Sequence, residues 1–161
     1  MADYHILHMT RVQAEKIITW SYPSPYDLYN LAPEDLPGLL NPAYRYHCLL
    51  DQTGELVGYC CYGIDAQVPG GKYSPGEPDV LDIGVGLRPD LTGQGTGRAF
   101  VTAILNYAQK TYQPVVFRVT VADFNQRSMK TFQRLGFEVK AQFVRHPYSL
   151  PFTQLERKTN E

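Results

Sequence analysis

The stretch RPDLTGQGTGRAF, from Arg88 to Phe100, places three glycines at alternate positions immediately before a helical pattern begins. A glycine inside a helix costs about 1 kcal/mol relative to alanine, so three at a helix entrance need a reason. The first N–H groups of a helix lack partners, and the helix dipole favours negative charge there. The stretch therefore predicts a phosphate-binding loop, with a tight turn that holds no ligand as the alternative.

The segment before this loop, Val80 to Leu87 (VLDIGVGL), has the composition of a strand but contains Gly84 and Gly86. Glycine within a strand often marks a bulge or the close approach of a ligand. The two glycines face the same side of the strand, because side chains alternate. A strand with a bare face, followed by a helix that receives phosphate, suits a long ligand with a pyrophosphate and a thin arm. Coenzyme A has that shape.

Two other phosphate-binding loops do not fit the stretch. A Walker loop needs Lys-Ser/Thr after its last glycine, whereas Arg98-Ala99 follows Gly97. A dinucleotide fingerprint needs Gly-x-Gly-x-x-Gly, and its last position falls on Phe100 or Arg98 here.

The composition limits the classes of function. The 161 residues suit one domain, and 15 basic against 16 acidic residues leave no basic block, so we expect no nucleic-acid partner. No apolar run reaches the roughly 20 residues of a membrane helix, and the N-terminus does not resemble a signal peptide. We therefore expect a cytoplasmic protein without membrane contact. The three cysteines are expected in the core, and the four histidines share no metal-ligand spacing, so no metal site is expected.

The apolar patterns alternate between strands and helices along the chain. Helices are expected from a cap at Thr10 to Trp20, over a short part of the proline-rich loop 21–44, and over residues 97–110 and 125–135. Strands are expected at residues 4–9, 46–51, 56–64, 80–88, after Pro114, and at 137–144 and 151–156. Residues 65–78 are expected to form a loop. The order predicts an α/β sheet with helices on both faces.

The central segment resembles the acetyl-CoA-binding segment of the GCN5-related N-acetyltransferase (GNAT) superfamily. The family's pyrophosphate loop, Gln/Arg-x-x-Gly-x-Gly/Ala, falls on Thr92 to Gly97, with Thr92 as a departure at the first position. A second family segment, Asn followed by a helix that ends in Gly-Phe, matches Asn125 to Phe137. The resemblance implies one GNAT domain over residues 1–161. Its fold would be a mixed, mostly antiparallel sheet of about seven strands flanked by helices, with a β-bulge in the central strand.

The resemblance also implies how acetyl-CoA would be held as the co-substrate. Backbone groups of Val85 and Leu87 would pair with the pantetheine arm. Amides of the loop would bind the pyrophosphate, namely those of Gly93, Gln94, Gly95, Thr96, Gly97 and Arg98. Asn125 would contact the coenzyme, or would cap its helix, or both.

The catalytic groups are less well defined by the resemblance. Many relatives carry a tyrosine four residues before the Gly-Phe pair, where it protonates the departing thiolate, but this chain has Phe132 there. Another tyrosine or water would have to serve, and Tyr148 is our candidate. Asp82, ahead of Asp79, is the candidate to accept the proton of the amine; a surface charge is the alternative.

The implied activity is transfer of an acetyl group to a primary amine by direct attack in a ternary complex. The acceptor would be a small amine or a peptide N-terminus, entering near the tyrosine-rich residues 21–45 and 65–78. A homodimer is expected by family analogy alone. Two alternatives stay open: a non-catalytic acyl-CoA binding or sensing module, suggested by Phe132, and a nucleotide-phosphate binder unrelated to acyl transfer.

Overall fold

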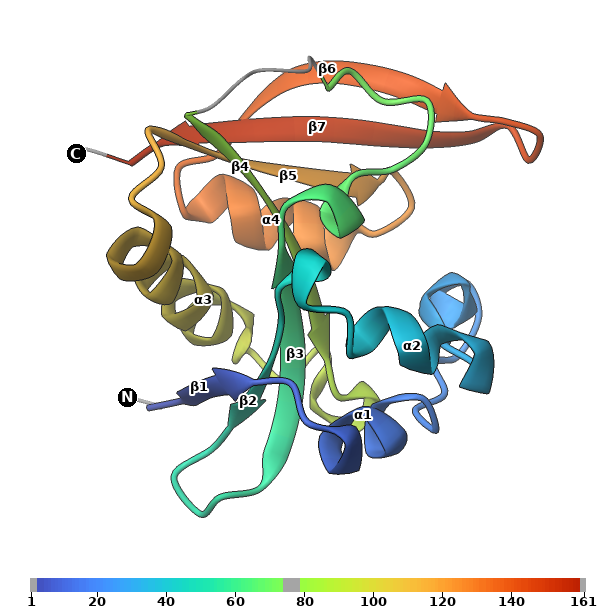
Figure 1. The fold of residues 1–161 in the computed structure, drawn as a ribbon. Coiled ribbons are helices and arrows are strands. Elements are labelled where there is room, and N and C mark those ends of the chain that lie inside the picture. Colours follow the sequence, from blue (N-terminus) through green and yellow to red (C-terminus); the bar gives the residue numbers. More distant parts are fainter. Residues whose placement is uncertain (1–2, 74–78, 160–161) are drawn as a thin grey trace. The chain divides into compact units, whose positions relative to one another are not determined.

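The computed structural model describes residues 3–73 and 79–159. Its helices and strands are β1 (His5–His8), α1 (Arg11–Ile17), α2 (Leu36–Leu39), β2 (Tyr46–Leu50), β3 (Leu56–Tyr62), β4 (Val80–Leu87), α3 (Gly97–Tyr112), β5 (Val116–Ala122), α4 (Gln126–Arg134), β6 (Glu138–Arg145) and β7 (Leu150–Lys158) (Figure 1). The expected elements are present with small shifts at their ends.

The strands form a seven-stranded sheet in the order β1-β2-β3-β4-β5-β7-β6. β1 with β2, β2 with β3, β5 with β7 and β6 with β7 are antiparallel, whereas β4 and β5 are parallel. This confirms the predicted mixed, mostly antiparallel sheet. Register shifts lie between Leu49 and Leu50 and between Val139 and Ala141. The bulge predicted in the central strand, β4, stays a prediction.

The chain divides into two compact units, and the boundary runs through β3, β4 and α3. Unit 1 comprises residues 1–61 and 85–104, and unit 2 comprises residues 62–84 and 105–161. The prediction that residues 1–161 form a single domain stays a prediction.

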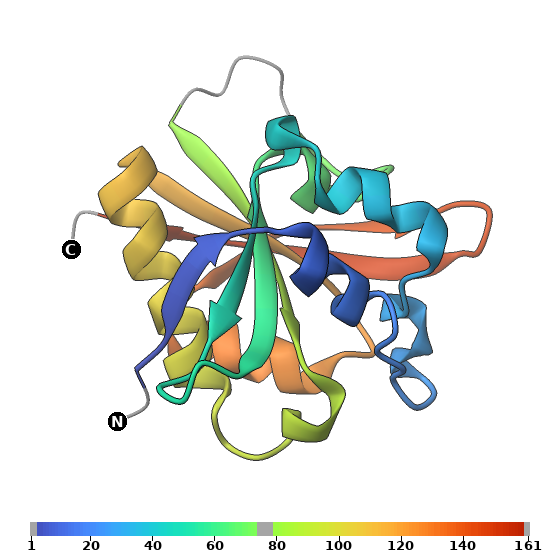
Figure 2. The ribbon, with the colours of Figure 1, turned by 60° about the horizontal axis from the view of Figure 1, so that its bottom comes forward.

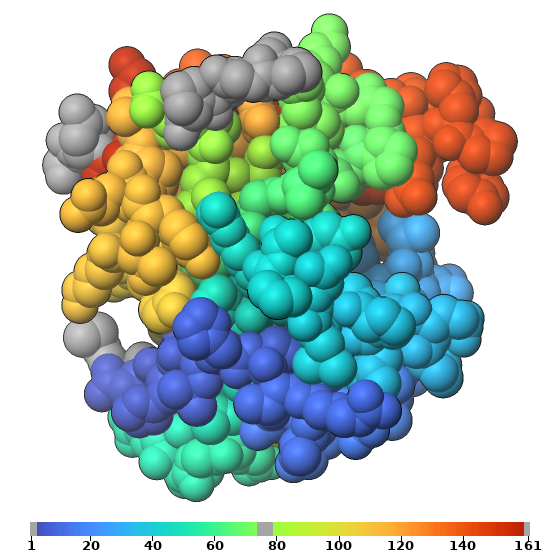
Figure 3. All heavy atoms as spheres, viewed as in Figure 1, coloured from blue at the N-terminus to red at the C-terminus, as the bar shows by residue number. Residues whose placement is uncertain are grey.

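In unit 1, the first two helices pack on the strands β2 and β3. Ala14 and Ile17 of α1 and Leu39 of α2 share a buried cluster with Cys48 and Leu56. Figure 2 shows the ribbon of these helices beside the first strands. On the face drawn in the space-filling view, the blue and cyan atoms of the N-terminal segment adjoin one another (Figure 3). This packing gives unit 1 its own apolar core.

Helix α1 begins and ends through local hydrogen bonds. The Thr10 side chain accepts a hydrogen bond from the Gln13 amide, as expected of an N-cap. The helix ends at Ile17 and not at Trp20, which corrects the predicted boundary. The Thr19 hydroxyl donates to the Lys16 carbonyl at 2.6 Å, and this local bond turns the chain out of the helix.

In unit 2, helix α4 packs against the β5-β7 part of the sheet. Arg157 of β7 lies over the rings of Phe117 and Phe137, and its guanidinium donates to the Leu135 carbonyl at 2.8 Å. Leu135 is the C-cap of α4, and Gly136 follows with a φ of 92°. The predicted C-terminal glycine of this helix is therefore confirmed.

Three further observations concern the cysteines, the helices and the residue types that bind metals. Cys48, Cys60 and Cys61 are all buried and none forms a disulfide, which confirms that they are core residues. Within residues 3–73 and 79–159, no helix combines the length and apolar character needed to cross a membrane. In the same part of the chain, no cluster of His, Cys, Asp and Glu could hold a metal ion.

Candidate functional site

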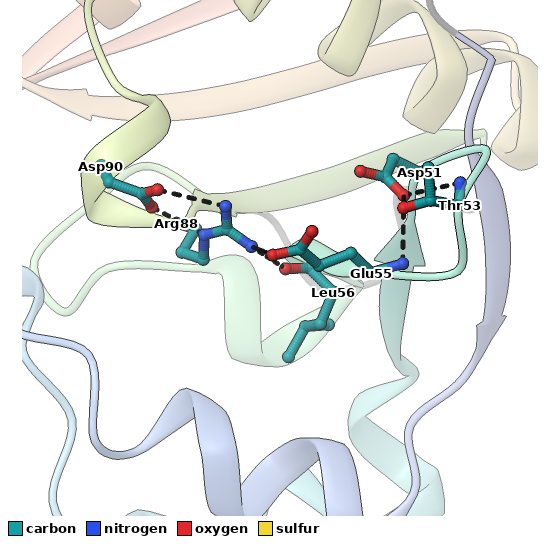
Figure 4. Close-up of polar contacts among 6 residues, drawn as sticks. All are labelled: Asp51, Thr53, Glu55, Leu56, Arg88 and Asp90. Carbon is teal, nitrogen blue, oxygen red and sulfur yellow. Dashed lines mark hydrogen bonds and ion pairs between the residues drawn. The ribbon is translucent and has the colours of Figure 1, made fainter.

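The loop between β4 and α3 lies in unit 1 and is fixed at its entrance by Arg88. The Arg88 guanidinium donates to both carboxylate oxygens of Asp90, at 2.6 and 3.1 Å. It also donates to the Glu55 carboxylate at 3.0 Å and to the Leu56 carbonyl at 2.7 Å (Figure 4). The hydrogen bond from Arg88 lowers the pKa of Asp90. Arg88 thus joins the start of the loop to the β2–β3 hairpin.

The loop is fixed at its far end by Phe100, in the first turn of α3. The Phe100 side chain is buried and packs edge-on against Tyr4, with ring centroids 5.8 Å apart. It also fills the space beside Gly58 of β3, where an added Cβ would overlap the Phe100 ring. The start of α3 is therefore set by packing on β3.

Between these two anchors, the backbone amides are unpaired. Among the described residues, no carbonyl or side chain accepts a hydrogen bond from the amides of Gly93 through Ala99, whereas the Phe100 amide donates to the Thr96 carbonyl at 3.0 Å. Gly93 and Gly95 have φ angles of 72° and 82°, which other residues rarely adopt. An added Cβ at Gly95 would meet nothing within 4 Å. The loop presents free donors on a backbone that requires glycine.

The charges around this loop favour an anion. α3 runs for 16 residues, and its first turn contains no acidic residue. Arg98, in that turn, is exposed and forms no ion pair with any residue that the structure describes. The free amides, the helix dipole and this guanidinium together form a positive environment that suits a phosphate group.

The face of β4 at Gly86 is not bare, which corrects the sequence interpretation. An added Cβ at Gly86 would overlap the ring of Tyr59, which projects from β3. Burial raises the pKa of this tyrosine. Gly86 is therefore small because an aromatic ring of the protein needs the space, and it gives no evidence for a ligand at that position.

Val85 and Leu87, the residues of β4 that were predicted to pair with a ligand arm, lie in unit 1 and are half-buried. The carbonyl of Leu87 already accepts a hydrogen bond from the Tyr22 hydroxyl at 2.6 Å. In unit 2, the β4–β5 ladder runs from Val80–Val116 to Asp82–Arg118 and does not continue at Ile83. Val85 and Leu87 as ligand contacts stay predictions.

Asp82 is buried in unit 2 and forms an ion pair. Its carboxylate accepts hydrogen bonds from Nε and Nη2 of Arg118, at 2.6 and 2.9 Å, and from Nε2 of Gln67 at 3.0 Å. The guanidinium also lies 4.9 Å from the centre of the Tyr73 ring. The alternative of a surface charge is thereby excluded, and the catalytic role of Asp82 stays a prediction.

The other predicted residues of unit 2 occupy three separate positions. Asn125 is the N-cap of α4, and its side chain accepts from the Ser128 amide at 3.2 Å, which confirms the capping role. Tyr148 is 77% exposed in the β6–β7 turn. Phe132 is buried against Phe137, with ring centroids 5.2 Å apart. Contact of Asn125 with a ligand and catalysis by Tyr148 are not tested by these positions.

Three interacting residues were missed by the sequence reasoning. These are Arg118, the hydroxyl of Tyr22, and the Arg88 side chain. A charged residue inside an otherwise apolar strand, such as Arg118 in Val116–Ala122, signals a buried partner of opposite charge. No comparable signal marks Tyr22, because its partner is a backbone carbonyl 65 residues away.

Comparison with protein-family models identifies a family. The model of the acetyltransferase (GNAT) family matches residues 11–137. Among curated proteins, the chain is 29% identical over 126 residues to mycothiol acetyltransferase of Acidimicrobium ferrooxidans. The aligned part is 78% of this chain but only 38% of that protein, so the chain spans about two fifths of this relative's length.

Solved structures agree in fold at low sequence identity. A GNAT-family acetyltransferase from Bacillus anthracis has a TM-score of 0.77 at 16% identity, covering 100% of this chain and 98% of its own. A spermidine N-acetyltransferase SpeG chimera of Vibrio cholerae and hSSAT has a TM-score of 0.76 at 15% identity, covering 96% and 95%. The protein yncA of Salmonella typhimurium, solved with its cofactor acetyl-CoA, has a TM-score of 0.68 at 18% identity, covering 99% and 95%.

Proposed function

The chain belongs to the acetyltransferase (GNAT) family, and on that premise we propose that it is an acetyl-CoA-dependent N-acetyltransferase acting on a primary amine. The coenzyme's pyrophosphate would lie against the amides of Gly93 to Arg98. The similar fold of yncA, which was solved with acetyl-CoA, supports the choice of co-substrate.

The observation that carries the proposal is the run of unpaired amides from Gly93 to Ala99. Hydrogen-bond donors of the backbone are nearly always satisfied, so successive free donors at a helix start fit a ligand with several acceptor oxygens. Gly95 leaves open space where a side chain would otherwise lie. A pyrophosphate meets both conditions.

The residues of this chain would have three tasks in the reaction. Bound acetyl-CoA supplies a thioester that an uncharged amine can attack directly. The loop amides hold the phosphates, and the backbone of Val85 and Leu87 would align the arm and orient the acetyl carbonyl. One group must accept the proton that the amine loses, and another must give a proton to the departing sulfur.

We propose Asp82 as the proton acceptor and Tyr148 as the proton donor. The contacts of Asp82 limit how it could act, because each of its carboxylate oxygens already accepts a hydrogen bond from Arg118. A water molecule between the amine and this carboxylate would let Asp82 accept the proton without touching the amine directly. Tyr148 is exposed, so its hydroxyl is accessible to solvent protons.

The acceptor is proposed only as a class, a small amine or a peptide N-terminus. One structural neighbour acts on spermidine according to its name, and the curated relative is a mycothiol acetyltransferase. The two names differ, and each protein is distant in sequence, so neither selects one amine for this chain. A homodimer is a further proposal that rests on the family alone.

Titration calorimetry with acetyl-CoA, CoA and ATP tests the coenzyme assignment. We expect binding of both CoA species in the micromolar range and no response to ATP. A thiol-release assay over a panel of amines, including spermidine and a peptide N-terminus, then tests catalysis.

The panel also separates the alternatives. Binding of CoA without thiol release on any amine would favour the acyl-CoA sensing module that Phe132 suggests. Binding of ATP but not of CoA would favour a nucleotide-phosphate binder.

A further inference from the structure

Tyr22 lies in the loop between α1 and α2, and its position is set within that loop. Its backbone amide donates to Oδ1 of Asn30 at 2.7 Å, which closes residues 22–30 into a compact loop. Its ring packs edge-on against Tyr29, with centroids 6.4 Å apart. The Tyr26 amide donates to the Pro23 carbonyl at 2.8 Å within the same loop. These contacts leave the Tyr22 hydroxyl at a defined place.

That hydroxyl holds one end of a peptide group in β4. It donates to the Leu87 carbonyl at 2.6 Å. The other polar end of the same peptide group, the Arg88 amide, donates to the Val57 carbonyl at 2.8 Å. Because a peptide group is planar, two hydrogen bonds at its opposite ends fix its orientation.

The Leu87–Arg88 peptide lies where the chain leaves β4, and the short turn of Pro89–Leu91 connects it to the free amides that begin at Gly93. The Arg88 side chain that follows is bound by Asp90, Glu55 and the Leu56 carbonyl. The direction in which the chain leaves β4 is therefore set by the peptide and by the Arg88 side chain together. Among the described residues of unit 1, the Tyr22 hydroxyl is the one side-chain group that donates to the Leu87 carbonyl. Without Tyr22, the carbonyl loses this hydrogen bond.

The Tyr22 hydroxyl is suited to act as a constant donor. Burial raises its pKa, so the phenol keeps its proton at any physiological pH. This favours a role in holding the backbone and makes the hydroxyl a poor source of protons for a reaction.

We propose that Tyr22 is a positioning residue that orients the Leu87–Arg88 peptide and, through it, the pyrophosphate-binding loop. In this way the loop of residues 22–30, which lies in the segment expected to admit the acceptor, is tied to the strand that would hold the coenzyme. The proposal rests on the proposed function for its coenzyme part, whereas its backbone part stands on the geometry alone.

The test compares Tyr22→Phe with the wild type and with Tyr44→Phe as a matched control. Both variants remove one phenolic oxygen from unit 1, and the Tyr44 hydroxyl makes no hydrogen bond to any described residue of β4. Hydrogen–deuterium exchange reports on the hydrogen-bonded amides of Arg88, Leu91 and Thr92, and calorimetry reports the Kd for CoA. We expect Tyr22→Phe to exchange about fivefold faster there and to bind CoA about fivefold more weakly, with Tyr44→Phe unchanged.

Each result decides the proposal. Unchanged exchange at the amides of Arg88, Leu91 and Thr92 in Tyr22→Phe overturns it, and so does faster exchange with an unchanged Kd. Failure of the wild type to bind CoA overturns the proposed function and the coenzyme part of this proposal. The exchange rates would then still decide whether Tyr22 holds the peptide.

A second pair of variants guards against loss of folding in Tyr22→Phe. Asn30→Leu removes the acceptor that holds the Tyr22 amide, whereas Asn30→Asp keeps an oxygen at that place. Faster exchange and weaker CoA binding in Asn30→Leu, restored in Asn30→Asp, support the proposal. Equal behaviour of the two variants contradicts it.

Discussion

At the scale of single residues, Gly95 is the position where the proposed ligand and the backbone angle both require a glycine. We expect Gly95→Tyr to weaken CoA binding by tenfold or more, measured by calorimetry, because the side chain would enter the open space beside the free amides. The φ of 82° also strains any side chain there, by about 1–2 kcal/mol.

Gly54 is the matched control, since it has a φ of 86° and equally open surroundings in the β2–β3 turn. Gly54→Tyr should lose similar stability and keep its affinity for CoA. Equal affinity of Gly95→Tyr and the wild type would contradict the assignment of the loop.

Asp82 carries a second prediction at this scale. Asp82→Asn should destabilise the protein by about 3 kcal/mol in chemical unfolding, because it removes the buried carboxylate that accepts two hydrogen bonds from Arg118, itself 4% exposed. If Asp82 accepts the proton of the amine, kcat/KM of the folded variant should also fall about 100-fold or more.

Asp79→Asn is the control for this experiment, because Asp79 lies just before the same strand and its side chain is exposed. A folded Asp82→Asn enzyme with the kcat/KM of the wild type would show that the carboxylate has a structural role alone, through its bonds with Arg118 and Gln67. Measuring the rate against pH adds a readout that lost stability does not change.

At the scale of elements, the pairing of β1 with β2 should depend on pH. His8 and His47 are directly opposite in this pair, with ring centroids 4.9 Å apart. Burial, and to a lesser extent the neighbouring His8, lowers the pKa of His47. Between the lowered pKa and the ordinary value near 6.5, the unfolded chain binds more protons.

The free energy of unfolding should therefore fall as the pH drops below about 6.5, by at most about 1.4 kcal/mol per pH unit for this one group. Urea titrations of the wild type and of His47→Gln at pH 7.5 and 5.5 measure it. The wild type should lose more stability than His47→Gln, and equal losses would contradict this account.

The contact of β3 with β4 and α3 inside unit 1 gives another prediction at this scale. Gly58→Ala should destabilise the protein by about 2 kcal/mol, since its Cβ would overlap Phe100 and come 2.7 Å from the Gly86 carbonyl oxygen. It should also weaken CoA binding, because Phe100 fixes the far end of the loop.

Gly38→Ala serves as its control, because the new Cβ would meet only the Tyr44 ring at 3.8 Å, an ordinary contact. That variant, in helix α2, should be as stable as the wild type or more stable by up to about 1 kcal/mol. Equal Tm values for Gly58→Ala and Gly38→Ala would contradict the close packing of Gly58 against Phe100.

At the scale of the whole molecule, coenzyme binding should appear as stabilisation of the folded chain. CoA at 100 times its Kd should add about 2.7 kcal/mol, which raises the Tm by roughly 5–11 °C for a chain of this size. ATP at the same concentration should leave the Tm unchanged. A larger shift with ATP than with CoA would contradict the proposed function.

The sequence by itself determined the elements, their order along the chain and the family. The alternating glycines, the apolar periodicity and the Asn125 cap are local features, and local hydrogen bonds and backbone angles decide them. Glycine is also the residue type that permits the positive φ values found at Gly93 and Gly95. The end of α1 was misplaced by three residues, because a threonine hydroxyl competes there with the helix.

The tertiary structure alone decided which distant groups meet. It put Tyr59 in the space beside Gly86, where the sequence had suggested a ligand, and Arg118 on Asp82, where the sequence offered a free carboxylate. It also placed the Tyr22 hydroxyl on the Leu87 carbonyl. Such contacts join residues 27 to 65 positions apart, and pattern reasoning cannot find them, because only packing and the burial of polar groups fix these partners.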